Sequence, residues 1–312
     1  MKKIFNIIIT VTALFSVILT ACAPAANETQ SQPAQKSSLK VLATTSFLAD
    51  ITQNVAGDRA VVEALLPLGT DPHSYEPVPG DVAKLSDSTV LIINGVEYES
   101  FLGPLLQNVD GKRLEIVASK GLEVNQMKGE DGTSDHAAGD PHMWLDPIRV
   151  ITYTENIRDG LSQADPEGAA TYKANAEAYI KQLDDLDQWI KEQVDTIPAE
   201  RRLLVTNHEA LGYFDARYGF KTVGAIIPSL STEASPSAQQ MAALVDQIKN
   251  SKSPAIFIGE SENPQLAKQI ADETGVKVVE DLYLETLTKG APAPTYIDMM
   301  KHNVNRIVEA LK

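Results

Sequence analysis

The sequence contains a single cysteine, Cys22, among its 312 residues, so an intramolecular disulfide is impossible. Basic residues are also scarce, because 27 Lys and Arg stand against 42 Asp and Glu and give a formal net charge of −15. Nucleic acids and anionic lipid surfaces attract basic proteins, so we expect no nucleic-acid partner, and cations are more compatible ligands. A G-x-S-x-G elbow, a P-loop and a dinucleotide-binding glycine motif are all absent, which removes common hydrolase and nucleotide-binding signatures.

The N-terminal residues have the layout of an export signal. Two lysines precede an apolar run over residues 4–19, and small residues follow it. Residues 19–22, Leu-Thr-Ala-Cys, resemble a bacterial lipobox, in which cleavage leaves the cysteine as the lipid-bearing first residue. We therefore predict a lipoprotein signal peptide over residues 1–21, lipidation of Cys22, and anchoring to the outer face of the bacterial cell membrane. In a cell with two membranes, this face is the periplasmic side.

The remainder of the chain is predicted to start with a tether and to continue as a globular protein. Residues 22–38 are rich in Ala, Pro, Gln, Ser and Asn, which is typical of a flexible tether. From residue 39, short apolar runs alternate with amphipathic stretches in the β-α-β rhythm of a parallel sheet. We predict strands at residues 39–44, 60–66, 89–93, 113–118, 203–206, 221–227, 254–258 and 276–279. Helices are predicted at residues 48–55, 80–85, 98–107, 209–218, 236–249, 264–274 and 296–311.

This rhythm breaks at Asp146 and resumes near Arg202. In between, residues 167–196 contain no proline, and their apolar residues recur at helical spacing. Such a helix would be on the order of 45 Å long at 1.5 Å per residue, which exceeds the width of one small domain. It is therefore predicted to connect two lobes.

The predicted fold is α/β, with two parallel-sheet α/β lobes joined by a single long linking helix. The lobes are predicted at residues 39–164 and 198–312, and the linking helix at 165–197. A single (β/α)8 barrel is the alternative fold, but the long helix and an extra helix in the middle of the chain do not fit its repeat.

Three of the five histidines follow predicted strands. His73 lies in GTDPHSYEP, His142 lies in GDPHMWLDP, and His208 directly follows the strand at 203–206. Ligands gather at the carboxyl ends of parallel strands, and the proline in each Asp-Pro-His stiffens its loop. Each histidine alone could be an ordinary turn or loop residue, but the matched pair favours a metal site. Three imidazoles with one carboxylate suit zinc. His136 and His302 are predicted to lie in a loop of small residues and on the exposed side of the last helix.

Four longer stretches carry a family resemblance. They are VLATTSFLADITQNVAGDRAVVEALLPLGTDPHSYEPVPGDVAKL, DPHMWLDP, LLVTNHEALGYFDARYGF and DLYLETLTKGAPAPTYIDMMKHNVNRIVEALK. In this order they resemble the solute-binding lipoproteins of zinc and manganese ABC importers, in the TroA-like superfamily of helical-backbone metal receptors. The resemblance implies one metal ion in the cleft between the lobes, with His73, His142 and His208 as ligands. At the third of these positions, zinc receptors usually have histidine and manganese receptors usually have glutamate.

The fourth ligand departs from the family pattern. The family usually has an aspartate in a segment like Leu-Tyr-Ser-Asp-Ser-Leu, whereas residues 282–287 read Leu-Tyr-Leu-Glu-Thr-Leu. The resemblance assigns this position to Glu285, and Asp281 and Glu280 stay as alternatives. Residues 128–140, KGEDGTSDHAAGD, stand where many zinc receptors carry a long His-rich loop. This acidic stretch is either a loose collector of cations or a plain solvated loop.

The sequence therefore predicts a monomeric, non-catalytic receptor that binds one ion per chain and delivers it to the membrane permease of an ABC importer. Zinc is the predicted cargo and manganese the alternative. The linking helix predicts little closure between the lobes, and affinity should fall on acidification through roughly pH 6.5, because metal-binding histidines must be neutral.

A zinc hydrolase and a surface adhesin are the alternatives from other classes. However, Gly212 stands where the HExxH motif requires its second histidine, and no repeat or dedicated partner-binding patch is present.

Overall fold

The computed structural model describes residues 37–107, 109, 111–126, 138–259 and 264–312. The predicted signal peptide, Cys22, most of the tether, and His136 with most of the acidic stretch lie outside these ranges. The described residues belong to one compact unit. Within the described ranges, no helix combines the length and apolar composition needed to cross a membrane.

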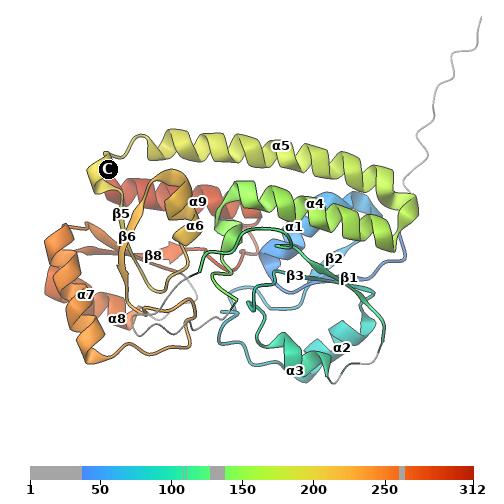
Figure 1. Cartoon of the computed structure of the whole chain (residues 1–312), viewed down its shortest axis with the longest axis horizontal. Helices are drawn as coiled ribbons and strands as arrows, with labels where there is room; N and C mark the ends of the chain where they lie inside the picture. The colour runs from blue at the N-terminus through green and yellow to red at the C-terminus, as the bar shows by residue number, and fades with distance from the viewer. Residues whose placement is uncertain (1–36, 108, 110, 127–137, 260–263) are drawn as a thin grey trace, which may run out of the picture. The chain divides into compact units, whose positions relative to one another are not determined.

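The first lobe is built on a parallel sheet with the strand order β2-β1-β3-β4. Three of its strands, β1, β2 and β3, are labelled in Figure 1. Its strands are β1 (Val41–Ala43), β2 (Val62–Ala64), β3 (Val90–Ile93) and β4 (Leu114–Val117). Side chains alternate between the two faces, so Val41 and Val90 pack toward α1 (Ser46–Ala56) and α4 (Pro147–Ala164). Leu42 and Leu91 pack on the other face, toward α2 (Pro79–Asp87) and α3 (Leu102–Leu106). The sheet is therefore covered by helices on both sides.

The second lobe has the same kind of sheet, with the order β6-β5-β7-β8. Its strands are β5 (Leu203–Thr206), β6 (Lys221–Ala225), β7 (Ala255–Gly259) and β8 (Lys277–Leu282). One face packs against α7 (Ala238–Ser251) and α8 (Gln265–Thr274), and the other against α6 (Gly212–Tyr218) and α9 (Tyr296–Leu311). Because the described strands form two separate sheets, the alternative of a single barrel is wrong.

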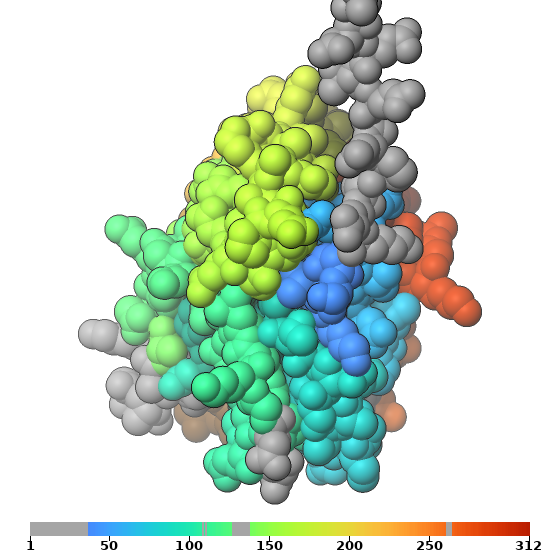
Figure 2. Space-filling view, turned by 90° about the vertical axis from the view of Figure 1, so that its right-hand side faces the viewer, coloured from blue at the N-terminus to red at the C-terminus, as the bar shows by residue number. Residues whose placement is uncertain are grey.

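Helix α5 (Ala169–Val194) runs along both lobes (Figure 1). It contacts α1 and α4 of the first lobe, and α6 and α9 of the second. Figure 2 shows its first turns above the residues that lead into β1. Its buried side chains join a hydrophobic core that also contains side chains from both sheets. They are Tyr172, Ala176, Tyr179, Leu183, Leu186, Ile190 and Val194. The two lobes thus share one core beneath this helix.

The secondary structure agrees with the sequence-based prediction, because each described strand overlaps a predicted one. The helix predicted at 98–107 is wrong in length, since only Leu102–Leu106 are helical. The side chain of Glu99 turns inward and accepts hydrogen bonds from the backbone N–H groups of Asn94 and Gly95, which holds this segment as a loop. Similarly, the helix predicted at 209–218 begins only at Gly212, because the preceding residues form the loop that carries His208.

We expect Leu183→Ala, in the shared core under α5, to lower the free energy of unfolding by about 2–5 kcal/mol, because Leu183 is fully buried and the substitution leaves a cavity. Urea denaturation of the soluble protein would measure the loss. Gln182→Ala, at the exposed neighbouring position, is the control and should change stability by less than about 0.5 kcal/mol. Equal effects of the two substitutions would contradict the shared core.

Candidate metal centre

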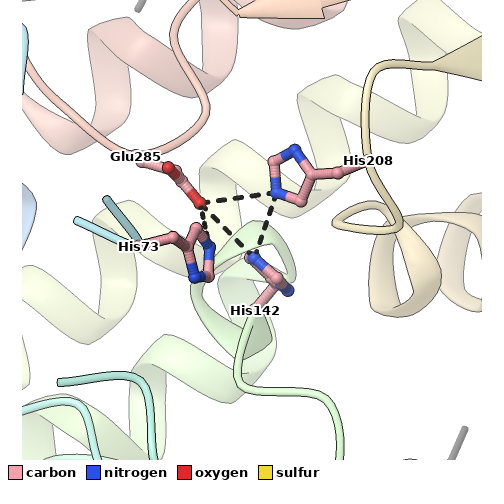
Figure 3. A group of neighbouring side chains, drawn as sticks. All are labelled: His73, His142, His208 and Glu285. Carbon is pink, nitrogen blue, oxygen red and sulfur yellow. Dashed lines mark hydrogen bonds and ion pairs between the residues drawn. The ribbon is translucent and has the colours of Figure 1, made fainter. Parts of the chain in front are cut away.

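Four loops at the carboxyl ends of strands bring His73, His142, His208 and Glu285 together (Figure 3). His73 lies between β2 and α2, and His142 lies between β4 and α4. His208 follows β5, and Glu285 follows β8. Each lobe therefore contributes two of the four side chains.

The two Asp-Pro-His motifs form the same local structure. In the first, Oδ1 of Asp71 accepts a hydrogen bond from the backbone N–H of His73 at 2.9 Å. In the second, Oδ1 of Asp140 accepts from the backbone N–H of His142, also at 2.9 Å. An aspartate that bonds the backbone two residues ahead forms an Asx turn, and the intervening proline restricts φ. The repetition in the sequence is therefore a repeated turn that fixes the backbone of a histidine.

The Nε2 atoms of the three histidines converge on one oxygen of the glutamate. Oε1 of Glu285 lies 2.9 Å from Nε2 of His73, 3.4 Å from that of His142 and 3.5 Å from that of His208. The Nε2 atoms of His142 and His208 are 3.4 Å apart. One ligand atom from each of the four residues lies within 4.8 Å of the others, and all four side chains are buried. This N3O donor set fits a four-coordinate divalent ion.

Contacts within the cluster shift the pKa values of Glu285 and His142 in opposite directions. Burial alone would raise the pKa of Glu285, but the charge of His73 and hydrogen bonds from the three histidines hold this pKa well below 4.5. Burial lowers the pKa of His142, but its hydrogen bonds with Asp140 and Glu285 outweigh burial and leave the pKa above 6.5. Metal binding requires neutral imidazoles, so an ion entering this cluster would displace protons.

Surrounding groups fix the orientation of the rings. Nδ1 of His142 lies 2.9 Å from Oδ1 of Asp140, which leaves Nε2 directed into the cluster. The hydroxyl of Tyr213 donates to the backbone oxygen of Asp140 at 2.8 Å, so the second lobe supports this turn. Tyr98 lies edge-on to His73, with ring centroids 5.4 Å apart, and Trp144 lies 5.2 Å from His142. These aromatic rings form an apolar wall around the polar cluster.

The alternative carboxylates for the fourth position lie outside the cluster. Asp281 forms an ion pair with Arg306 at 2.8 Å, and Glu280 forms one with Lys268 at 3.1 Å. Nε2 of His302 lies 2.8 Å from the backbone oxygen of Asp281, and His302 is half-buried. The prediction of an exposed His302 is therefore wrong, because β8 and α9 pack together at this position.

A cavity of about 570 Å³ adjoins the cluster at His73. Three glutamates and three serines are among the residues that line it, which are His73, Glu97, Glu99, Ser100, Gly103, Ser229, Ser231, Glu233 and Ala234. Two larger cavities, on the flanks of the two sheets, contain none of the four clustered residues in their lining.

Comparisons with known proteins agree with this architecture. The chain matches the profile of the family described as ZnuA, zinc-uptake complex component A, periplasmic, over residues 41–310. It is 38% identical over 274 residues to the manganese-binding lipoprotein MntA of Halalkalibacterium halodurans, which covers 88% of each chain. It is 33% identical over 320 residues to the manganese ABC transporter substrate-binding lipoprotein PsaA of Streptococcus pneumoniae, which covers 100% of this chain and 99% of the relative.

Solved structures show the same fold. The periplasmic zinc-binding protein TroA of Treponema pallidum superimposes with a TM-score of 0.78 at 30% identity, over 87% of this chain and 98% of TroA. A manganese-bound periplasmic metal-binding protein of Candidatus Liberibacter asiaticus gives a TM-score of 0.77 at 29% identity, over 87% and 99% of the two chains.

The fold and the buried cluster define the class of two-lobed, metal-binding substrate-binding proteins of ABC transporters. Within this class, the chain belongs to the ZnuA family. The predicted fold is thereby confirmed, and so is the expected non-catalytic character, because the relatives are transporter receptors and not enzymes.

The metal-free cluster should contribute most to stability between about pH 4.5 and 6.5, the ordinary pKa values of Glu285 and His142. Glu285 has a lowered pKa, so its contribution is present above 4.5 and is lost as the pH falls through the folded value. His142 has a raised pKa, so its contribution is present below 6.5 and is lost as the pH rises through the folded value.

Chelator-treated protein should therefore unfold at a lower urea concentration at about pH 9 than at about pH 6. Burial also raises the pKa of Glu99 to about 7. Ionisation of Glu99 therefore also lowers the stability of the folded protein as the pH rises from 6 to 9. The decisive measurement is thus the loss of stability between pH 6 and pH 9 in wild type and in His142→Gln. This loss should be smaller in the variant, because it lacks the imidazole. An identical pH dependence of both proteins would contradict a raised pKa of His142 in the folded protein.

Proposed function

We propose that this protein captures a divalent transition metal ion outside the cytoplasm and delivers it to the permease of an ABC importer, with zinc as the cargo. The observation that carries this proposal is the convergence of three Nε2 atoms and one carboxylate oxygen within 4.8 Å in a buried site. His73, His142, His208 and Glu285 are the proposed ligands of one ion. As cargo, this ion is released to the permease, so the site must bind reversibly.

The donor set supports zinc over manganese. Imidazole suits zinc, whereas carboxylate, carbonyl and water suit manganese, and zinc binds N/O sites more tightly in the general order of divalent ions. His208 is the residue on which this choice depends, because it supplies the third imidazole. Manganese is the alternative cargo, and it is supported by the names of MntA and PsaA. The name of TroA supports zinc.

We propose that the protein is located at the outer face of the cell membrane and is anchored by a lipid on Cys22. The lipobox-like sequence before Cys22 supports this, and relatives such as MntA and PsaA are named lipoproteins. We further propose a monomer with lobes at residues 39–164 and 198–312 and the linking helix at 165–197. Helix α5 (Ala169–Val194) lies within residues 165–197 and contacts helices of both lobes, which supports these boundaries.

The proposed mechanism follows from the distribution of ligands. His73 and His142 come from the first lobe, and His208 and Glu285 from the second, so an ion bridges the lobes and favours the arrangement in which all four can reach it. The shared core under α5 opposes a large hinge motion. Capture and release therefore depend mainly on the ligand loops.

We expect His208→Ala to weaken zinc binding by more than about 100-fold, because losing a ligand should exceed the 10–100-fold effect of losing a supporting partner. Competitive titration of chelator-stripped protein, starting after Cys22, with zinc and manganese would measure both affinities. His208→Glu should shift the preference toward manganese, because it replaces an imidazole with a carboxylate. His302→Ala, a histidine outside the cluster, is the control. Unchanged zinc affinity in His208→Ala would reject the proposed site.

Substitutions of Asp140 can distinguish two effects on His142, namely the orientation of its ring and the negative charge beside it. Asp140→Ala removes the acceptor for both the backbone N–H and the ring Nδ1, and should weaken zinc binding about 10–100-fold. Asp140→Asn keeps an oxygen that can occupy the Oδ1 position and should cause a smaller loss. The same titration measures both variants. Equal affinities of Asp140→Ala and wild type would show that the turn does not position the ligand.

A further inference from the structure

A hydrogen bond joins the two lobes at the edge of the cluster. Oγ1 of Thr232, in the loop between β6 and α7, donates to Oδ2 of Asp71 at 2.6 Å. Asp71 belongs to the loop of the first lobe that carries His73. Both residues are half-buried, and the acceptor is a carboxylate, which strengthens the bond relative to one between neutral groups.

The same carboxylate fixes the backbone of His73. While Oδ2 of Asp71 accepts from Thr232 and, at 3.0 Å, from Oγ of Ser74, its Oδ1 accepts from the backbone N–H of His73. The loop is tied to the second lobe at another point as well, because the backbone N–H of Gly69 donates to Oγ1 of Thr286, next to Glu285, at 3.0 Å. The His73 loop is therefore held between two segments of the opposite lobe.

Thr232 also lies beside the cavity that adjoins His73. Its neighbours Ser231 and Glu233 line this cavity from the second lobe, and His73 lines it from the first. An ion that leaves the cluster past His73 would enter this cavity, so separating the two loops would widen the exit. The bond between Thr232 and Asp71 opposes this separation.

We propose that Thr232 is a positioning residue that latches the second lobe to the His73 loop and slows release of the metal ion. This inference rests on the proposed function of the four-residue cluster. The hydroxyl acts through Asp71, because its hydrogen bond is to that carboxylate. Because the proposed latch holds the lobes together beside the bound ion, its loss should accelerate dissociation and leave association nearly unchanged.

Stopped-flow dissociation of zinc-loaded protein into excess chelator tests this. The fluorescence of Trp144, buried 5.2 Å from the ring of His142, provides the signal. Thr232→Val, which removes the hydroxyl at nearly constant volume, should release zinc on the order of tenfold faster, a ratio that corresponds to about 1.4 kcal/mol. Thr232→Ser keeps the hydroxyl and should restore slow release. Thermal unfolding of both metal-free variants checks that they fold like wild type.

The outcomes separate the latch from the site. Release from Thr232→Val at the wild-type rate, or equally fast release from Thr232→Ser, would overturn the latch while leaving the proposed function intact. A change confined to the association rate would also overturn it. If wild-type protein bound neither zinc nor manganese, the proposed function would fail, and the latch with it.

Discussion

The structure depends on one buried carboxylate. Glu285 is 5% exposed, and an uncompensated charge in such a place costs several kcal/mol. Its compensation comes from three imidazoles, and two of them belong to the other lobe. Neither lobe alone can therefore satisfy the site. The scaffold must hold two separate sheets close enough for four loops to share a space within 4.8 Å.

Direct links beside the cluster help to meet this requirement. The indole N–H of Trp144, two residues after His142, donates to the backbone oxygen of Leu284, the residue before Glu285, at 2.7 Å. The hydroxyl of Tyr296, at the start of α9, donates to the backbone oxygen of Trp144 at 2.7 Å. Two of the four loops are thus fixed to each other across the lobes, beneath the shared core of α5.

The sequence predicts the scaffold well because the elements follow local rules. Short apolar runs predict the strands, and apolar residues at helical spacing predict the linking helix, because both patterns are visible within a short stretch of sequence. The three histidines were found because prolines and strand ends mark their loops. Choosing among Glu285, Asp281 and Glu280 requires the family pattern, because the sequence does not distinguish three carboxylates so close together. In the structure, Asp281 and Glu280 lie on β8 and form ion pairs with Arg306 and Lys268. The roles of Tyr213 and Thr232 have no signal in the sequence, because their hydrogen-bond partners, Asp140 and Asp71, lie 73 and 161 residues away along the chain.

The two Asp-Pro-His motifs show how similar local structures acquire different roles. Both use one carboxylate oxygen to fix the backbone of a histidine. Asp140 is fully buried and also holds the ring of His142 with that oxygen. Asp71 is half-buried and bonds Thr232 of the other lobe, beside a cavity. The ring of His142 is therefore fixed by the carboxylate of its own turn, whereas the carboxylate that fixes the backbone of His73 is also bonded to the second lobe.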